Sequence, residues 1–265
     1  MQLMRGLQLN LKDIREECWD IARDTATTDS DRLWTTREMN RYINRVYRFI
    51  ARETKCIRDD ITAAICRINV APPTDLADLT TKAATDPYYA QDLAFYNDPD
   101  SWLYQQLVSP YNFPLDPRIL DIDEVKWTKR QWRLTHTSVS KWQINPWWEQ
   151  VIGMSTEYAT DLSNNRFTVN FRNVESDTLK LVVRRLPLVD LINDLDEPEF
   201  RTHYHDFIVN GVLYYMYSKQ DADTIDKTKA SEYYGLYLKD IDEIKQQEVI
   251  VNNRLRPNHS TDAFR

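Results

Sequence analysis

Two histidines, His203 and His205, stand two positions apart near Glu199 and Asp206, so these residues form a group of potential metal ligands. Imidazole and carboxylate groups are the usual nitrogen and oxygen ligands of zinc and related ions. Residues two apart on a helix point to different faces, so this pair cannot chelate an ion as residues four apart do. The sequence contains no HExxH motif. We therefore expect no metal and no cofactor at these histidines.

Two carboxylate clusters, residues 194–197 and 221–223, could in principle supply acid-base catalysis. They fit better as loop and helix-cap residues, because negative charge is favoured at the amino end of a helix. The sequence has no GxSxG motif, and its 3 cysteines show no CxxC spacing. We expect no enzymatic activity. A site assembled from distant carboxylates, or from His203 and His205, is the less favoured alternative.

Three tryptophans, Trp142, Trp147 and Trp148, lie near Lys141 and Arg133 and could stack on nucleic-acid bases. The net charge of −7 argues against this reading, because nucleic-acid binding depends on clustered cations that neutralise phosphates. With only 4 glycines, the chain also has no glycine-rich phosphate loop. Packing within the protein, or against a neighbouring subunit, is the favoured role of these rings. The 15 tyrosines and 8 tryptophans are typical of protein interfaces.

The elements that would position these side chains begin with two amphipathic helices, over residues 8–25 and 36–54. Thr35 and Glu38 have the spacing of a capping box, in which each side chain accepts a hydrogen bond from the backbone N–H of the other. We expect the two helices to form an antiparallel hairpin. The apolar positions of the second helix are Met39, Tyr42, Ile43, Val46, Tyr47 and Ile50.

The middle of the chain has strand periodicity. Between Ile57 and Val70 we expect a strand, and after residue 119 several short runs are rich in β-forming residues. These runs are residues 122–128, 131–135, 157–160, 166–171 and 178–184. Between them and the first strand, residues 72–113 form a long insertion with many turn signals and one short predicted helix near residues 101–108.

Helical spacing returns after Pro198, which suits the first position of a helix, and Gly211 could admit a close helix crossing. Asp221 is the predicted cap of a last long helix that ends near Val251. Residues 252–265 show no periodicity, and we expect them to be extended until a partner orders them.

The sequence therefore predicts an α+β fold: a helical bundle, made of two N-terminal and two C-terminal long helices, with an inserted small antiparallel β domain. No run of about eighteen apolar residues occurs, so we expect no membrane-spanning segment. The predicted domains are residues 1–56 for the N-terminal hairpin, 57–190 for the β domain with its loop 72–113, 191–251 for the C-terminal hairpin, and 252–265 for an extended tail.

Five ordered motifs are spread over most of the chain: Trp34-Thr35-x-x-Glu38-x-x-x-Tyr42-Ile43-Asn44, Pro117-Arg118-Ile119-Leu120-Asp121-Ile122 before Val125, Arg185-Leu186-Pro187, Asp196-Glu197-Pro198-x-Phe200-x-x-x-Tyr204-His205, and Lys219-Gln220-Asp221-Ala222-Asp223-Thr224 with Ala230 and Tyr233. Their order and spacing resemble the head-to-tail connector, or adaptor, proteins of tailed bacteriophages, particularly short-tailed ones. Residues 72–113 depart from the family pattern in being longer and richer in aromatic and acidic residues.

The resemblance implies a structural virion protein at the head-tail junction, synthesised in the cytoplasm of the bacterial host. It implies a dodecameric ring that docks on the portal protein, extends the DNA channel and offers an attachment surface to tail or nozzle proteins. Genomic double-stranded DNA would pass through the lumen without specific binding. The alternative within the same class is another phage neck, tail-completion or assembly protein.

Similar proteins bind the portal through C-terminal segments, which gives a set of candidate site residues. The candidates for portal docking are Arg254, Leu255, Arg256 and Phe264. The candidates for a subunit or tail interface are Trp102, Tyr104, Trp147 and Trp148.

Overall fold

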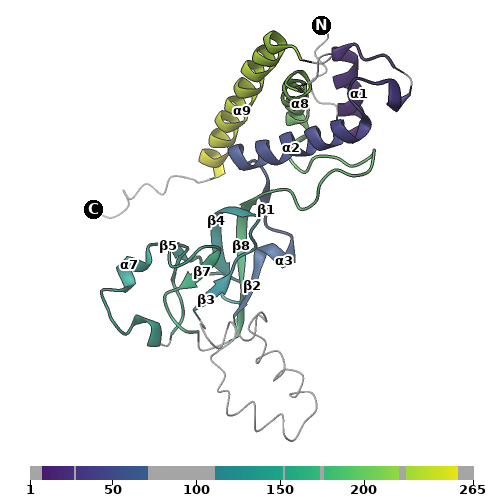
Figure 1. Cartoon of the computed structure of the whole chain (residues 1–265). Coiled ribbons are helices and arrows are strands. Elements are labelled where there is room, and N and C mark those ends of the chain that lie inside the picture. Colours follow the sequence, from purple (N-terminus) through teal and green to yellow (C-terminus); the bar gives the residue numbers. More distant parts are fainter. Residues whose placement is uncertain are drawn as a thin grey trace, which may run out of the picture. The chain divides into compact units, whose positions relative to one another are not determined.

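The structure of the chain is a computed structural model that describes residues 8–26, 28–70, 111–151, 153–173, 176–220 and 225–255. The chain divides into two units. The helical unit comprises Met1–Ile57 and Arg185–Arg265, and the β unit comprises Arg58–Arg184. Among the described residues, the long helices lie in the helical unit and the sheets lie in the β unit (Figure 1). The predicted α+β class is confirmed.

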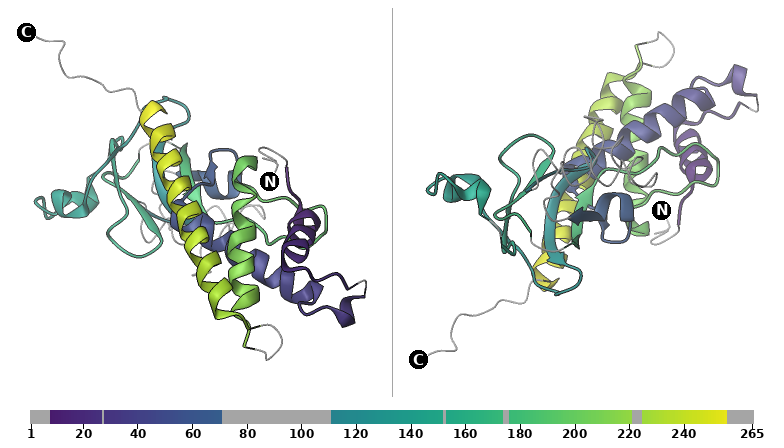
Figure 2. Two further views of the ribbon diagram at one scale, coloured as in Figure 1. Left: turned by 90° about the horizontal axis from the view of Figure 1, so that it is seen from above. Right: turned by 90° about the horizontal axis from the view of Figure 1, so that it is seen from below.

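The described part of the helical unit is built from α1 (Leu11–Ala22), α2 (Thr36–Thr54), α8 (Phe207–Tyr217) and α9 (Lys227–Leu255), with short 3-10 turns at Asp29–Asp31 and Thr202–Tyr204. Helix α8 contacts α1, α2 and α9. Figure 2 shows α8 and α9 running side by side. Helix α8 is therefore the central element, and the other three pack around it.

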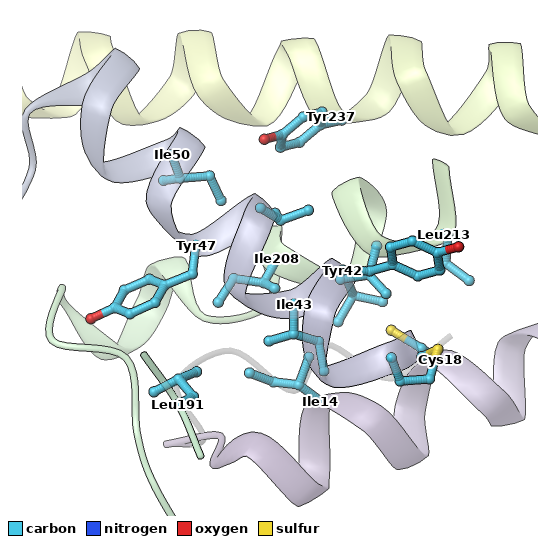
Figure 3. Close-up of a cluster of buried hydrophobic side chains, with 14 of the residues drawn as sticks. Ile14, Cys18, Tyr42, Ile43, Tyr47, Ile50, Leu191, Ile208, Leu213 and Tyr237 are labelled. Carbon is cyan, nitrogen blue, oxygen red and sulfur yellow. The ribbon is translucent and has the colours of Figure 1, made fainter. Parts of the chain in front are cut away.

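Apolar side chains from all four helices meet in one core (Figure 3). Ile14 of α1 and Ile43 of α2 are completely buried, as are Ile208 and Leu213 of α8. The sequence prediction for α2 is confirmed, because each of its predicted apolar positions is buried. Burial of this kind stabilises the fold by roughly 1.5–3 kcal/mol for each large apolar side chain.

The first two helices begin at capping boxes. In α2, Thr35 Oγ1 accepts a hydrogen bond from the Glu38 N–H, and the Glu38 carboxylate accepts one from the Thr35 N–H at 3.1 Å. The predicted start of α2 is thus confirmed. Asn10 and Asp13 make the same pair at α1, so that helix begins at Leu11 rather than at residue 8.

The third helix begins nine residues later than Pro198, the predicted first position, because α8 starts at Phe207. Tertiary contacts hold the preceding segment in a different conformation: the Glu199 N–H donates to the Tyr47 hydroxyl at 2.8 Å, and the His205 ring bonds two backbone groups. These long-range partners outweigh the local preference of proline for a helix start.

The last helix begins at Lys227, where Asp226 accepts hydrogen bonds from the N–H groups of Thr228 and Lys229. The predicted cap, Asp221, lies outside the described residues. The helix also continues to Leu255, so the predicted end near Val251 is four residues too early.

Strand β8 (Asp177–Arg185) organises one sheet of the β unit, since β1 (Arg58–Asp59), β2 (Arg67–Val70) and β4 (Ile119–Trp127) all pair with it. The second sheet has the order β3-β7-β6-β5, formed by Asn112–Pro114, Arg166–Val169, Glu157–Ala159 and Thr135–His136. Short helices α3 (Ala63–Cys66) and α7 (Val139–Trp142) and a 3-10 turn at Trp148–Gln150 complete the described part of this unit.

Three strand predictions need correction. The single strand expected between Ile57 and Val70 is two strands, β1 and β2, with the short helix α3 between them. Both strands pair with β8, at successive stretches of it. Strand β5 covers Thr135–His136 rather than residues 131–135, and it runs parallel to β6, so the β domain is not wholly antiparallel. Residues 71–110, which contain the predicted short helix, lie outside the described residues.

Gly211 stands where α8 crosses its neighbours, as the sequence suggested. A Cβ atom there would lie 2.7 Å from Val46 Cγ1 and 2.8 Å from the ring of Tyr237, closer than carbon atoms pack.

We expect Gly211→Ala to lower the free energy of unfolding by about 1–3 kcal/mol, because the cost of overpacking exceeds the gain in helix propensity. Urea denaturation measures this change in the free energy of unfolding. Gly235→Ala is the matched control on α9, where the Cβ meets nothing within 4 Å. This control should raise stability by up to about 1 kcal/mol, and equal effects of the two substitutions would contradict the crossing.

Asp240 on α9 gives the helical unit a pH-dependent contact. Burial raises the pKa of its carboxyl from 3.8 to about 6, partly offset by a 2.7 Å hydrogen bond from the Asn210 side chain on α8. Because the folded-state pKa is the higher one, the stabilising effect of protonation is complete below pH 3.8 and is lost as the pH rises through about 6.

We expect the Asp240→Asn variant to match the stability of the natural protein at pH 4 and to exceed it at pH 7.5 by about 1 kcal/mol, after allowance for partial solvent exposure. Melting curves across this pH range test it; a constant difference would contradict the assignment.

Candidate interaction surfaces

The buried His205 contacts backbone groups through both of its ring nitrogens. His205 is buried, its Nδ1 accepts a hydrogen bond from the Leu9 N–H at 3.2 Å, and its Nε2 lies 3.2 Å from the carbonyl oxygen of Phe200. The Leu9 carbonyl oxygen also lies 3.1 Å from Nδ1, so the donor and acceptor roles of the ring depend on its tautomer. Within the ranges that the structure describes, no three His, Cys, Asp or Glu residues gather to hold an ion. His205 instead fastens the segment before α1 to the turn before α8.

Residues 188–197, here called the acidic loop, contain four acidic and no basic residues. The Asn44 side chain on α2 holds the middle of this loop: its Nδ2 donates to the Leu191 carbonyl at 2.8 Å, and its Oδ1 accepts from the Leu191 N–H at 2.7 Å. The Leu191 side chain is buried in the helical core. One amide side chain therefore replaces both hydrogen bonds that a neighbouring strand would provide.

The far end of the acidic loop is bound to the start of α1. The carbonyl oxygens of Asp194 and Asp196 accept hydrogen bonds from the N–H groups of Lys12 and Leu11 at 3.0 and 2.8 Å. These donors belong to the first helical turn, which has no partners within the helix. Arg15, which is buried, reaches Asp194 Oδ1 at 2.8 Å. The loop is thus fixed at both its middle and its end.

The carboxylate cluster at 194–197 has a structural role in this loop. The Asp196 side chain accepts hydrogen bonds from the N–H groups of Asn193 and Ile192 at 2.8 and 2.7 Å, and these bonds lower the pKa of its carboxyl. The cluster therefore shapes a turn, as the sequence suggested for loop residues. It stands at the amino end of α1 rather than at the start of α8.

Three apolar side chains of the acidic loop point to solvent. Val189 is 69% exposed, Ile192 73% and Leu195 79%. The hydrogen bonds of Asn44, Asp196 and the start of α1 hold the loop backbone in this conformation. A fixed group of exposed apolar side chains is typical of an interaction surface.

The β unit carries a surface of the opposite charge. Residues 126–133, here called the basic hairpin, contain four basic and no acidic residues. Trp127 anchors it: this side chain is buried, its indole N–H donates to the Ser155 carbonyl at 2.9 Å, and its backbone N–H donates to Trp132 at the same distance. Gln131 closes the turn with a left-handed φ of 58°.

Trp132 is 56% exposed between the cations of this hairpin. Arg133 makes an ion pair with Glu124 at 3.0 Å yet keeps 74% of its side chain exposed. The Lys129 ammonium donates to the Ser176 carbonyl, and Arg130 lies 3.1 Å from the Met154 sulfur. The sequence predicted strands over residues 122–128 and 131–135, and the charge of the hairpin was not identified, although residues 126–133 contain four basic and no acidic residues.

Residues 9–259 match the sequence model of a protein family described as SU10 adaptor protein. The chain belongs to this family. The resemblance to phage head-to-tail adaptors is therefore confirmed. No curated protein shows significant similarity to the chain. As a member of the SU10 adaptor family, the protein is a phage adaptor and a component of the virion, and the family implies interaction with portal and tail proteins.

Several motif residues that suggested the family hold the SU10 adaptor together. Thr35 caps α2, Asn44 clamps the acidic loop, and His205 ties down the segment before α1. Arg185, which is buried, pairs with Glu199 at 2.6 Å. The resemblance thus reflects the framework of the helical unit more than an exposed site.

The tryptophans proposed for the interface differ in burial. Trp142 and Trp148 pack together with ring centroids 5.3 Å apart, and the Trp142 indole donates to Glu157 at 2.8 Å. Both are buried in the β unit of the adaptor, so of these three tryptophans only Trp147, which is 66% exposed, presents its ring for stacking on bases. The other two interface candidates, Trp102 and Tyr104, lie outside the described residues.

The portal-docking candidates lie at the end of α9 and beyond it. Arg254 and Leu255 form its last residues, which corrects the prediction that the extended tail starts at residue 252. Arg256 and Phe264 lie outside the described residues.

Among the helices that the structure describes, none is long and apolar enough to cross a membrane.

The clamp on the acidic loop can be tested by Asn44→Ala. This change removes the partners of the buried Leu191 N–H and carbonyl, so we expect the free energy of unfolding to fall by about 1–3 kcal/mol. Hydrogen exchange at the Leu191 amide should accelerate more than exchange in α9.

Arg37→Ala is the control for this substitution, since Arg37 lies exposed on the same helix. Its effect should stay within about 0.5 kcal/mol. Unchanged exchange at Leu191 in Asn44→Ala would show that the loop is held by other contacts.

Proposed function

We propose that this SU10 adaptor forms a ring on the portal of a short-tailed phage, extends the DNA channel and provides the attachment surface for tail or nozzle proteins. The observation that carries the proposal is the family match over residues 9–259, which spans both units. Its action requires binding and no turnover, so the proposal assigns the chain no catalytic residue. A dodecameric ring is the stoichiometry that we propose.

The C-terminal end of α9 is the proposed portal-binding element. The helix is 29 residues long, or about 43 Å, and its inner face packs on the helical core as far as Glu248. Near its end Val249 and Ile250 are exposed. From Val249 to the end of the helix at Leu255 the sequence contains no acidic residue, although the chain as a whole is acidic. An apolar and basic helix end followed by a short segment suits docking into a groove of another protein.

The net charge of each copy fits a channel through which DNA moves. A net charge of −7 for each copy is multiplied by the number of subunits in a ring. DNA binding depends on protein cations that neutralise the DNA phosphates. A surface with excess negative charge instead repels the phosphates. We propose that the lumen lets the genome pass without specific contacts.

A second candidate is a different phage neck or tail-completion protein. Trp147 favours a contact with a tail component in either case, since an exposed tryptophan next to the buried Trp142 and Trp148 cluster is a suitable anchor for a partner. Ring formation without portal binding would favour this second candidate.

Deletion of residues 256–265 tests the portal-binding element. The deletion leaves every described residue of α9 in place, so we expect the melting temperature to change little. Docking on portal rings of the same phage should be lost, as measured by native mass spectrometry and negative-stain imaging. The control is the full-length chain, which should dock under the same conditions. Docking of the shortened chain at full occupancy would contradict the assignment of this segment.

A further inference from the structure

We propose that the basic hairpin of one copy docks on the acidic loop of the next copy, and that this contact joins neighbouring subunits of the ring. The inference rests on the proposed ring and adds the residues that hold it together. Trp132 would lie against Val189, Ile192 and Leu195, with cations and carboxylates around them.

The first argument is charge complementarity. The hairpin, residues 126–133, carries four basic and no acidic residues, and the loop, residues 188–197, carries four acidic and no basic residues. Copies with a net charge of −7 repel one another, so association requires a local arrangement in which opposite charges meet. The hairpin is one described surface that can supply this to an acidic neighbour, and it sets an exposed tryptophan among its cations.

The second argument is that both surfaces combine exposed apolar side chains with a fixed backbone. The loop is held by Asn44 and by the start of α1, and the hairpin is held by buried Trp127. Rigid surfaces lose little conformational entropy on binding. Tryptophan and arginine are also the residues that most often dominate interface energetics, and the hairpin has Trp132 between Arg130 and Arg133.

The third argument is that the charged groups remain available to a partner. Asp194 bonds Arg15, yet 60% of its side chain is exposed. Arg133 keeps 74% of its side chain exposed beside Glu124. A carboxylate can accept more than one hydrogen bond and a guanidinium can donate several, so these internal pairs do not saturate either group.

The two surfaces belong to different units of the chain, so each copy presents two different patches. A contact between different patches is heterologous, and repeated heterologous contacts close into a ring when the rotation per subunit allows it. A symmetric pair of identical patches would stop at a dimer. The arrangement therefore matches the type of assembly that an adaptor needs.

The experiment is a charge swap in the full-length chain. The hairpin variant carries Arg130→Glu and Arg133→Glu, and the loop variant carries Asp190→Lys and Glu197→Lys. Asp194 and Asp196 are left unchanged because they support the fold of the loop. Ring occupancy on portal rings of the same phage is measured by native mass spectrometry, and thermal melting checks that each variant is folded.

Each variant alone cancels the net charge of one surface and sets its two new side chains against like charges on the other surface, so we expect ring occupancy to fall by about tenfold or more. An equimolar mixture should recover it, because each contact in an alternating ring then joins opposite charges. The chain that carries all four substitutions should also assemble. The matched control, Arg37→Glu with Arg41→Glu on α2, makes the same charge change as the hairpin variant and should assemble normally.

Normal rings from either single variant, or no recovery in the mixture, would overturn the proposal. If the hairpin variant forms rings but loses retention of duplex DNA in a fluorescence-anisotropy assay, the hairpin contacts DNA and the subunit contact is wrong. These outcomes leave the adaptor function standing. Failure of the natural chain to dock on the portal would instead refute the proposed function.

Discussion

The close crossing at Gly211 is the constraint on which the helical unit depends. Only a residue without a side chain lets α8 approach Val46 of α2 and Tyr237 of α9 at the same point. With α8 in that place, α1 packs against it and α9 follows a fixed line along it. The start of α1 then holds the acidic loop, and α9 carries the proposed portal-binding end at Leu255. The absence of a Cβ atom at Gly211 thus allows the helix packing on which both proposed interaction elements of this unit depend.

The polar contacts serve the surfaces more than the core. Asn44, Arg15 and His205 each make a hydrogen bond to a partner distant in sequence, although Nε of the buried Arg15 has no partner among the described residues. Buried polar groups without partners would cost stability, whereas satisfied ones specify a single arrangement. In this adaptor they hold irregular segments in place, so that a loop without regular structure can present apolar side chains as firmly as a helix does. This arrangement suits the proposed ring, in which each subunit would repeat identical contacts.

Local signals in the sequence predicted the elements that depend on local contacts. The cap at Thr35, the apolar face of α2 and the close approach at Gly211 could all be predicted, because each depends on residues within a few positions or on the small size of one residue. The start of α8 could not, because Tyr47 and Leu9 hold the segment after Pro198 from distant parts of the chain. The parallel pairing of β5 and β6 is likewise non-local.

The interaction surfaces were harder to predict, because they depend on which side chains the fold buries and which it leaves exposed. Trp147 and Trp148 are neighbours in sequence, yet one is exposed and the other packs on Trp142. The basic hairpin around Trp132 was visible only as a charge pattern, and its exposure depends on the turn that Trp127 anchors.

The central claim is that this SU10 adaptor forms a ring on the portal, and imaging of the assembled complex by electron cryomicroscopy tests it most directly. The account predicts one closed ring on each portal, with the ends of α9 facing the portal and neighbouring copies in head-to-tail contact. A portal that binds no ring, or a ring in which α9 ends point away from the portal, would contradict it.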